Sequence, residues 1–223
     1  MRPNDTSAAM SLPPIHPEGR IFVAIAIIIT FGLFWISAVA GTVGVFLCLA
    51  VAAFFRDPAR VPPPEASAVV AGGDGRIEAI VHVPPPPELG LGEAARLRVS
   101  TFLSLFNVHV NRVPVSGVVR QVRYTPGKFL NASLDKASSD NERNAVLIVT
   151  PEGKEVVVVQ IAGLVARRIL CTLKEGQQVR AGERMGLIRF GSRVDVYLPA
   201  GTSTNVRVGQ TAVGAETVLA NLD

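Results

Sequence analysis

The longest uncharged stretch of the chain limits its fold most, because it is too apolar and too long for an ordinary soluble domain. Residues 21–55 contain no charged side chain. As a single helix this run would be about 50 Å long, whereas the hydrocarbon core of a bilayer is about 30 Å thick. The small residues of Ala38–Gly44 offer a place for the helix to break. We therefore expect two short membrane segments, about Ile21–Ser37 and Val43–Phe55, in a helical hairpin or as two shallow spans.

The residues in and around this apolar segment bear on its orientation in the membrane and on whether it is cleaved as a signal peptide. Arg20 precedes it and Arg56 and Arg60 follow it, which favours both ends facing the cytoplasm. The tripeptide Ala38–Ala40 looks like the cleavage site of a secretory signal peptide. However, the apolar run before it exceeds the usual length of about 7–15 residues and resumes directly afterwards. A buried helical pair in a soluble core is the other alternative. The preceding residues 1–20, which contain four prolines, are expected to be irregular.

The composition also favours a membrane protein over a nucleic-acid-binding or metal-binding one. Of the 223 residues, 48% are hydrophobic and 18% are charged, and the mean hydropathy is +0.37. The net charge of +4 comes from scattered basic residues, with only 6% aromatics between them. Such a charge suits anionic lipid headgroups better than nucleic acid. The two cysteines, Cys48 and Cys171, are far apart, and there are only three histidines. We expect neither a disulfide framework nor a metal site.

After the proline-rich junction Val61–Pro64, the pattern changes to short β-type runs separated by turn residues. Gly176–Glu183 echoes Gly209–Glu216, and both are similar to the hairpins of lipoyl- and biotinyl-type β folds. We therefore expect a mainly β, sandwich- or barrel-like domain with lipoyl-like hairpins over residues 56–223, preceded by the α-helical membrane anchor at residues 21–55. The expected strands are Arg76–Val83, Ala95–Phe102, Gly117–Tyr124, Ala145–Thr150, Glu155–Ile161 and Arg193–Leu198.

The dipeptide Gly191-Ser192, near the C-terminus, is the minimum that a chain needs to cut itself. The Ser192 hydroxyl can attack the preceding carbonyl, because Gly191 has no side chain to block the approach and tolerates strained dihedrals. Elimination from the resulting ester leaves dehydroalanine, which hydrolyses to a pyruvoyl group at a new N-terminus. Gly-Ser is also a common turn dipeptide, so the pair alone decides little.

Three further motifs precede this pair: Phe55–Pro58, Asp74–Ile77 and Phe106–Pro114. In this order, the four motifs resemble the phosphatidylserine decarboxylases in their short, proteobacterial and archaeal-like form. The resemblance runs from about Phe54 to near the C-terminus. Longer members of that family carry Leu-Gly-Ser-Thr at the cleavage site and a second histidine three positions after the first. This chain has Phe-Gly-Ser-Arg at residues 190–193 and Arg112 in place of the second histidine, so that histidine's roles are not carried over.

The resemblance implies a proenzyme that cuts itself between Gly191 and Ser192. The large chain (1–191) and the small chain (192–223) would remain paired as a heterodimer, and a higher oligomer is also open. The implied cofactor is a covalent pyruvoyl group derived from Ser192, which forms a Schiff base with phosphatidylserine and acts as an electron sink. The products would be phosphatidylethanolamine and CO₂. As a lyase of phospholipid biosynthesis, the protein would lie at the cell membrane with its catalytic domain on the cytoplasmic side.

Two further residues receive catalytic roles from the resemblance. His109 lies in Asn107–Asn111, where apolar and polar residues alternate as in a strand, so it would share a face with both asparagines. A histidine titrates near neutral pH and can orient the substrate carboxylate or reprotonate its α-carbon. Asp74 begins an Asp-Gly pair that is also a common turn signal. The resemblance implies that its carboxylate serves self-cleavage by polarising His109 or activating Ser192.

Phosphate and carboxylate recognition needs cations, and the arginine fork is well suited to both groups. The candidates are Arg112, Arg143, Arg167 and Arg168. Two other functions are open. One is a membrane-anchored, non-enzymatic β-module adaptor, although no lysine occupies the hairpin tips as in a lipoylated carrier. The other is a serine hydrolase that pairs Ser192 with Lys128 or Lys174. Both would remain uncut.

Overall fold

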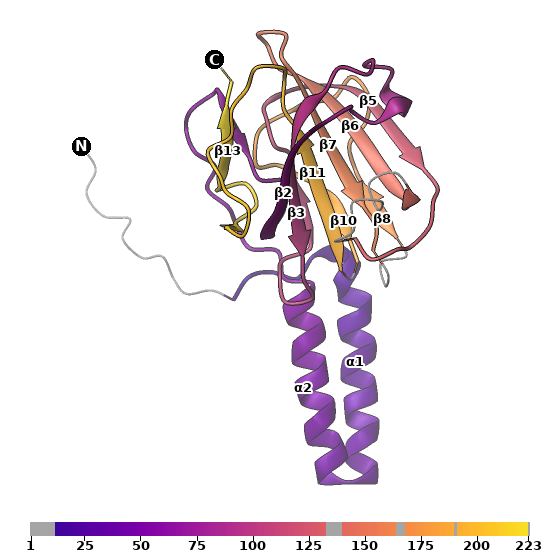
Figure 1. Cartoon of the computed structure of the whole chain (residues 1–223). Coiled ribbons are helices and arrows are strands. Elements are labelled where there is room, and N and C mark those ends of the chain that lie inside the picture. Colours follow the sequence, from indigo (N-terminus) through magenta and orange to yellow (C-terminus); the bar gives the residue numbers. More distant parts are fainter. Residues whose placement is uncertain (1–11, 133–139, 164–167, 190, 223) are drawn as a thin grey trace, which may run out of the picture. The chain divides into compact units, whose positions relative to one another are not determined.

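A computed structural model describes residues 12–132, 140–163, 168–189 and 191–222. The chain divides into two compact units, Met1–Ala59 and Arg60–Asp223. The first unit contains a pair of apolar helices, and the second is built almost entirely of strands (Figure 1). The expected fold class, a mainly β domain preceded by a helical pair, is therefore confirmed.

The helical unit consists of α1 (Pro17–Ile36) and α2 (Ala38–Phe54). Helix α1 begins earlier than the sequence predicted, because Pro17 occupies its first turn and the His16 side chain accepts a hydrogen bond from the Glu18 N–H at 3.3 Å. Residues 17–20 are consequently helical and not irregular. By length and composition α1 can cross a membrane, whereas α2 is equally apolar but has only 17 residues. Both helices expose large apolar side chains, including Trp35 and Phe46.

The two helices are separated at Ser37, not within Ala38–Gly44 as the sequence predicted. Ser37 is extended, with φ −165° and ψ 156°, and its Oγ caps α2 by accepting a hydrogen bond from the Ala40 N–H at 3.1 Å. The small residues instead belong to α2, whose buried Gly41 and Gly44 face α1. A Cβ atom on Gly41 would lie 2.2 Å from the Phe34 ring. These glycines thus allow close packing of the two helices, as small residues do between membrane helices.

The second unit is organised around one curled sheet of eight strands in the order β12-β2-β3-β11-β7-β6-β5-β9, all antiparallel (Figure 1). All six expected strands are confirmed, with ends that differ by at most two residues. The strands are β2 (Gly75–Val83), β3 (Arg96–Leu103), β5 (Gly117–Thr125), β6 (Arg143–Val149), β7 (Glu155–Ile161), β9 (Gln178–Val179), β11 (Ser192–Tyr197) and β12 (Thr211–Ala212).

Two smaller sheets and one short helix complete this unit. Strand β10 (Arg184–Ile188) lies between β4 (Val110–Arg112) and β8 (Ile169–Cys171), while β1 (Ala68–Val70) pairs with β13 (Val218–Asn221). The larger hydrophobic cluster lies on the face of the main sheet that carries Val194 and Val196. A smaller cluster on the other face contains Tyr197 and Leu89, which belongs to the 3-10 helix η1 (Pro87–Leu89). In β6, β7 and β11, alternate residues thus pack into different clusters.

The sequence repeat corresponds to a structural repeat. Strands β9 and β12 occupy the same positions within Gly176–Glu183 and Gly209–Glu216, and each is followed by a left-handed residue, Gly182 (φ 83°) or Ala215 (φ 68°). Strand β9 pairs with the start of β5, and β12 pairs with the start of β2. The capping bonds also match: Ser116 Oγ accepts from the Ala181 N–H at 3.0 Å, and Asp74 Oδ1 accepts from the Gly214 N–H at 2.8 Å.

Candidate active site

The Gly191–Ser192 peptide bond lies where β11 begins, between a left-handed glycine and a buried serine. Gly191 has φ +56°, a left-handed conformation that glycine adopts without strain. Ser192 is fully buried, and its Oγ has no hydrogen-bond partner among the described residues. Buried hydroxyl groups are normally hydrogen-bonded. A buried Oγ without such a bond, next to the Gly191 carbonyl, is therefore available as a nucleophile.

The residues that follow Ser192 fix the strand from its other face. Arg193 is 2% exposed and binds Asp195 through two contacts, Nε to Oδ1 at 2.9 Å and Nη2 to Oδ2 at 3.1 Å. Its Nη1 donates to the Ala132 carbonyl at 3.0 Å. On the same face, burial raises the pKa of Tyr197 to about 12, so its phenol stays neutral at physiological pH. This buried polar cluster anchors the start of β11 and leaves Ser192 on the opposite face.

Gly163 gives the Gly191 carbonyl the space that it occupies. In the antiparallel ladder Arg193 pairs with Ile161, so Gly191 and Gly163 face each other two residues beyond that pair. A Cβ atom on Gly163 would lie 1.9 Å from the Gly191 oxygen and 3.3 Å from the Ala132 Cβ. Any side chain at residue 163 would therefore displace the carbonyl that Ser192 must attack.

A buried asparagine holds the chain segments around this carbonyl together. Asn141 is fully buried, and its Nδ2 donates to the carbonyls of Leu130 and Ala162, both at 2.8 Å. Its Oδ1 accepts from the Leu130 N–H at 2.9 Å. The side chain thus ties the segment that leads to Ala132 to the end of β7 next to Gly163. An amide that satisfies three backbone groups in a buried site is well suited to fixing such a junction.

His109 lies beside the strand that leads to the cleavage site. The Ile188 N–H at the end of β10 donates to the His109 carbonyl at 3.4 Å, and Gly191 follows three residues later. His109 is fully buried, and its Nδ1 lies 3.0 Å from the Asn107 carbonyl oxygen. A carbonyl oxygen only accepts, so Nδ1 carries the proton in this bond. In the neutral ring, Nε2 then holds the basic lone pair.

The strand expected around His109 is shorter than predicted. Strand β4 covers only Val110–Arg112, and His109 precedes it. Asn107 lies in a turn instead, where its Oδ1 accepts from both the N–H and the Oγ of Ser104 at 2.8 Å. The side chain of Asn111 binds Gln160, whose Nε2 donates to Asn111 Oδ1 at 2.8 Å. The prediction of a continuous strand over Asn107–Asn111 is therefore wrong. With it goes the reason for placing His109 on the same face as both asparagines.

Asp74 belongs to a turn on the face of the sheet toward which Ser192 points. The Gly72 carbonyl accepts from the Arg112 N–H at 2.8 Å, and a Cβ atom on Gly72 would lie 2.8 Å from the Val194 side chain. Asp74 Oδ2 forms an ion pair with Arg60 at 2.5 Å, in addition to the bond of Oδ1 with the Gly214 N–H. The turn is thus next to β4, which follows His109, and to β11, which begins with Ser192.

The four arginine candidates have different surroundings. Arg112 is buried, and its Nη1 donates to the Gly182 carbonyl at 3.3 Å. Arg143 lies on the face opposite Ser192 and binds both carboxylate oxygens of Glu88, at 2.7 and 3.0 Å. Although burial acts to raise it, these hydrogen bonds hold the pKa of Glu88 below its usual value. Arg168 is exposed just before β8, and Arg167 lies outside the described residues.

The structural role of Gly163, Asn141 and the Arg193–Asp195 pair was not predicted. Gly163 and Asn141 have no sequence signal, because each acts on a segment far away in the chain. The Arg193–Asp195 ion pair did have a sequence signal. Charged residues two apart in an otherwise apolar strand share a face, and both can be buried there only as a pair.

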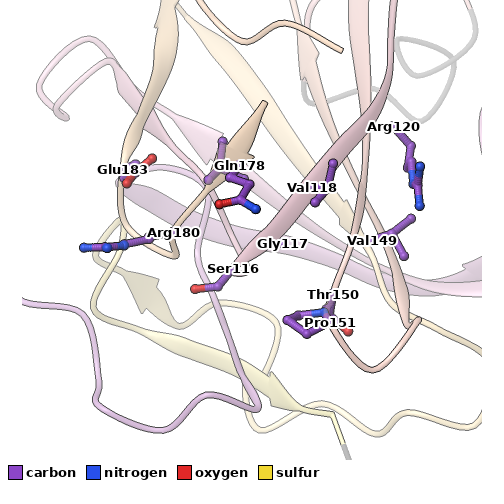
Figure 2. Close-up of a pocket in the computed structure, with 11 residues that line it drawn as sticks. Ser116, Gly117, Val118, Arg120, Val149, Thr150, Pro151, Gln178, Arg180 and Glu183 are labelled. Atoms are coloured by element: carbon purple, nitrogen blue, oxygen red, sulfur yellow. The ribbon is translucent and has the colours of Figure 1, made fainter. Parts of the chain in front are cut away.

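A cavity of about 720 Å³ lies at the other end of the sheet, and its lining contains none of the candidate residues (Figure 2). It surrounds Ser116 and Gly117, at the end of the β5–β6 pair opposite Arg143. These two residues correspond to Asp74 and Gly75 in the structural repeat. The cavity therefore lies beside the turn that is equivalent, in the structural repeat, to the Asp74 turn.

The position of Gly163 leads to a prediction about self-cleavage. We expect Gly163→Ala to slow the cut between Gly191 and Ser192 by about 10- to 100-fold, because overpacking of this size costs about 1–3 kcal/mol. The time course of fragment appearance after synthesis measures the rate. Gly32→Ala is the matched control, since a Cβ atom there has no neighbour within 4 Å. Cleavage of Gly163→Ala at the normal rate would show that this close approach is unimportant.

The chain is similar to proteins of one known family. A family model described as phosphatidylserine decarboxylase matches residues 47–220. The chain is also 56% identical over 218 residues to a protein of Azorhizobium caulinodans named phosphatidylserine decarboxylase proenzyme. That match covers 98% of this chain and 93% of the relative. Similarity of this extent includes the residues around Asp74, His109 and Ser192.

Proposed function

The chain belongs to the phosphatidylserine decarboxylase family, and from this premise we propose that it cuts itself between Gly191 and Ser192 and then converts phosphatidylserine to phosphatidylethanolamine and CO₂. The observation that carries the proposal is the buried Ser192 Oγ, without a hydrogen-bond partner among the described residues, next to a left-handed glycine. A hydroxyl without such a bond is available for an intramolecular attack.

The cleavage begins when Ser192 Oγ loses its proton and bonds to the carbonyl carbon of Gly191. The carbon–nitrogen bond then breaks, the nitrogen gains a proton, and an ester joins the two parts of the chain. Removal of the Ser192 Cα proton expels the Gly191 carboxylate and leaves dehydroalanine. Addition of one water and loss of one ammonia give the pyruvoyl group. Gly163 supports the first step, because its missing side chain leaves the attacked carbonyl in reach.

The fold supports a heterodimer of the two products. The small chain would contain β11, β12 and β13, and each of them pairs with a strand of the large chain: β11 with β3 and β7, β12 with β2, and β13 with β1. The Arg193 bond to the Ala132 carbonyl would also join the two chains. Because β11 lies inside the sheet, separation would expose both hydrophobic clusters. We therefore propose that the fragments remain together.

In decarboxylation, the pyruvoyl carbonyl supplies an electron sink for the negative charge left when CO₂ departs. The site suits such a group, because Ser192 is buried at the end of a strand that is fixed on both sides. We propose that His109 Nε2 takes up a proton from water and delivers it to the substrate α-carbon, while Nδ1 is held by the Asn107 carbonyl. A buried imidazole with one nitrogen fixed is a directed proton donor or acceptor.

The apolar α1 suits an enzyme whose substrate stays in a bilayer. Extracting a lipid costs about 0.8 kcal/mol for each CH₂ group of its acyl chains, so an active site held at the membrane avoids a large penalty. We propose that the β unit lies on the cytoplasmic side, as Arg20, Arg56 and Arg60 around the helical pair indicate.

We propose that Asp74 assists self-cleavage, and its contacts with Arg60 and Gly214 allow a test. Asp74→Asn keeps the cap on the Gly214 N–H and removes the charge, so we expect slower cleavage by about tenfold or more. Arg60→Ala is the matched variant, since it removes the ion pair and keeps the carboxylate. If the carboxylate acts only as a structural partner of Arg60, both variants will slow the cut equally. Fragment formation followed by mass spectrometry distinguishes the two outcomes.

An intact mass spectrum of the detergent-solubilised protein tests the proposed function first. We expect two fragments that meet at Gly191/Ser192, the smaller one lighter by one ammonia than its serine form. The same preparation should release CO₂ from phosphatidylserine in mixed micelles. A single mass near 23.6 kDa would contradict the proposal and favour an uncut adaptor or hydrolase.

A further inference from the structure

The turn between β3 and β4 presents two large apolar side chains to solvent. Leu105 is 54% exposed and Phe106 is 87% exposed. We call these two residues the apolar tip. The turn is stiffened by Asn107, whose Oδ1 accepts two hydrogen bonds from Ser104 and whose N–H donates to the Ser104 carbonyl at 3.0 Å. Exposed aromatic and aliphatic side chains on a stiff turn are typical of an interaction surface.

The apolar tip is joined directly to both proposed catalytic residues. Leu103, the last residue of β3, pairs with Ser192, so the tip begins two residues beyond that pair. Along the chain this is at most about 7–11 Å, given the length of an extended residue. On the other side of the tip, the Asn107 carbonyl binds His109 Nδ1 at 3.0 Å.

Other exposed groups of suitable chemistry lie at the same end of the sheet. Tyr124, near the end of β5, is 58% exposed, and its strand partner is Asn144. The preceding residue of β6, Arg143, pairs with Ile161, which also pairs with Arg193 on β11. Arg168 is exposed just before β8. Ile169, the first residue of β8, pairs with Ile188, whose N–H donates to the His109 carbonyl. An aromatic ring and a cation near an apolar tip match the interfacial region of an anionic bilayer.

We propose that the apolar tip inserts into the surface of the bilayer that contains the substrate, and that it sets the depth of the active site. This inference rests on the proposed function, because it takes the substrate to be a membrane lipid. The headgroup layer is about 5–8 Å thick on each side of the hydrocarbon core. A tip that reaches the boundary of the hydrocarbon therefore places Ser192 and His109 at the level of the lipid headgroups.

Tryptophan fluorescence tests the insertion without relying on turnover. Trp35 is the only tryptophan in the chain, so Trp35→Phe gives a silent background. In that background, Phe106→Trp should lose most of its emission in phosphatidylcholine–phosphatidylserine vesicles whose acyl chains carry bromine near the headgroup. Glu152→Trp is the matched control, since Glu152 is exposed in the turn between β6 and β7 at the opposite end of the sheet. Its emission should not change.

Two results would overturn the inference. One is equal emission of Phe106→Trp in brominated and ordinary vesicles. The other is a shielded, blue-shifted emission without lipid, which would indicate that a second protein copy covers the tip. If the chain proves to be uncut, the quenching experiment still decides whether the tip enters the bilayer, so the two proposals fail separately.

The rate on vesicles provides a second readout. We expect Leu105→Ser combined with Phe106→Ser to lower phosphatidylserine turnover on vesicles by about tenfold, because the apolar area that held the site at the membrane is lost. The rate is expressed per cleaved chain, so that an effect on maturation is excluded. Glu152→Ser serves as control. An unchanged rate on vesicles would contradict the role of the tip.

Discussion

Replacing Ser192 by alanine should leave one uncut chain of 23.6 kDa that releases no CO₂ from phosphatidylserine. The alanine removes the hydroxyl that we propose as the nucleophile on the Gly191 carbonyl and as the precursor of the pyruvoyl group. Because Ser192 Oγ has no hydrogen-bond partner among the described residues, its removal should change the free energy of unfolding by less than about 1 kcal/mol. Loss of function with an unchanged free energy of unfolding would therefore show that Ser192 acts in the reaction and not in folding. Intact mass, a thermal melt and the decarboxylation rate measure the three quantities.

The control for this experiment is Ser203→Ala, which removes an exposed hydroxyl from the same proposed small chain. This variant should be cut and active at the normal rate. A Ser192→Ala chain that still splits at residue 191 would place the nucleophile elsewhere. An uncut Ser192→Ala chain that decarboxylates phosphatidylserine would remove the pyruvoyl group from the mechanism.

His109→Ala should lower the rate of phosphatidylserine decarboxylation by about 10²- to 10⁴-fold, the usual contribution of a positioned acid or base. The rate must be expressed per cleaved chain, since Asp74 and His109 could also act in maturation. His109 is fully buried, and its Nδ1 lies 3.0 Å from the Asn107 carbonyl oxygen, so we assign the proposed proton transfer to Nε2. Alanine at this position removes that group and adds no charge.

His82→Ala is the matched control, because His82 is an exposed histidine on β2. It should retain the normal rate. If cleaved His109→Ala protein works at the normal rate, His109 has no part in decarboxylation, and another group must carry the proton. A His109→Ala chain that remains uncut would assign the residue to self-cleavage instead.

Local patterns in the sequence were sufficient for most of the secondary structure. The strand predicted at Glu155–Ile161 is β7, residue for residue, because a run of apolar residues between turns has few alternatives. The repeat of Gly176–Glu183 at Gly209–Glu216 also corresponds to two equivalent structures. The helix break was placed wrongly, since glycines in Ala38–Gly44 can either end a helix or let two helices approach. Only contact with Phe34 decides between these roles.

The candidate site likewise has parts that the sequence predicted and parts that it did not. A dipeptide such as Gly191-Ser192 can be found in the sequence because the reacting atoms are neighbours along the chain. Its surroundings cannot be found this way. Gly163, two residues after β7, faces the Gly191 carbonyl, and Asn141 fixes the segment that leads to Ala132. Arg143, a candidate for phosphate recognition, binds Glu88 on the other face of the sheet.

The sequence by itself determined the two apolar helices, six strands of the main sheet and the Gly191-Ser192 dipeptide, because each depends on residues that are neighbours along the chain. Tertiary structure alone decided what surrounds that bond. Pairing of β11 with β3 and β7 brings Leu103 and Gly163 to Ser192 and Gly191. The physical reason is that burial, close approach and hydrogen bonding of the reacting groups depend on strand register, which residues distant in the chain establish together.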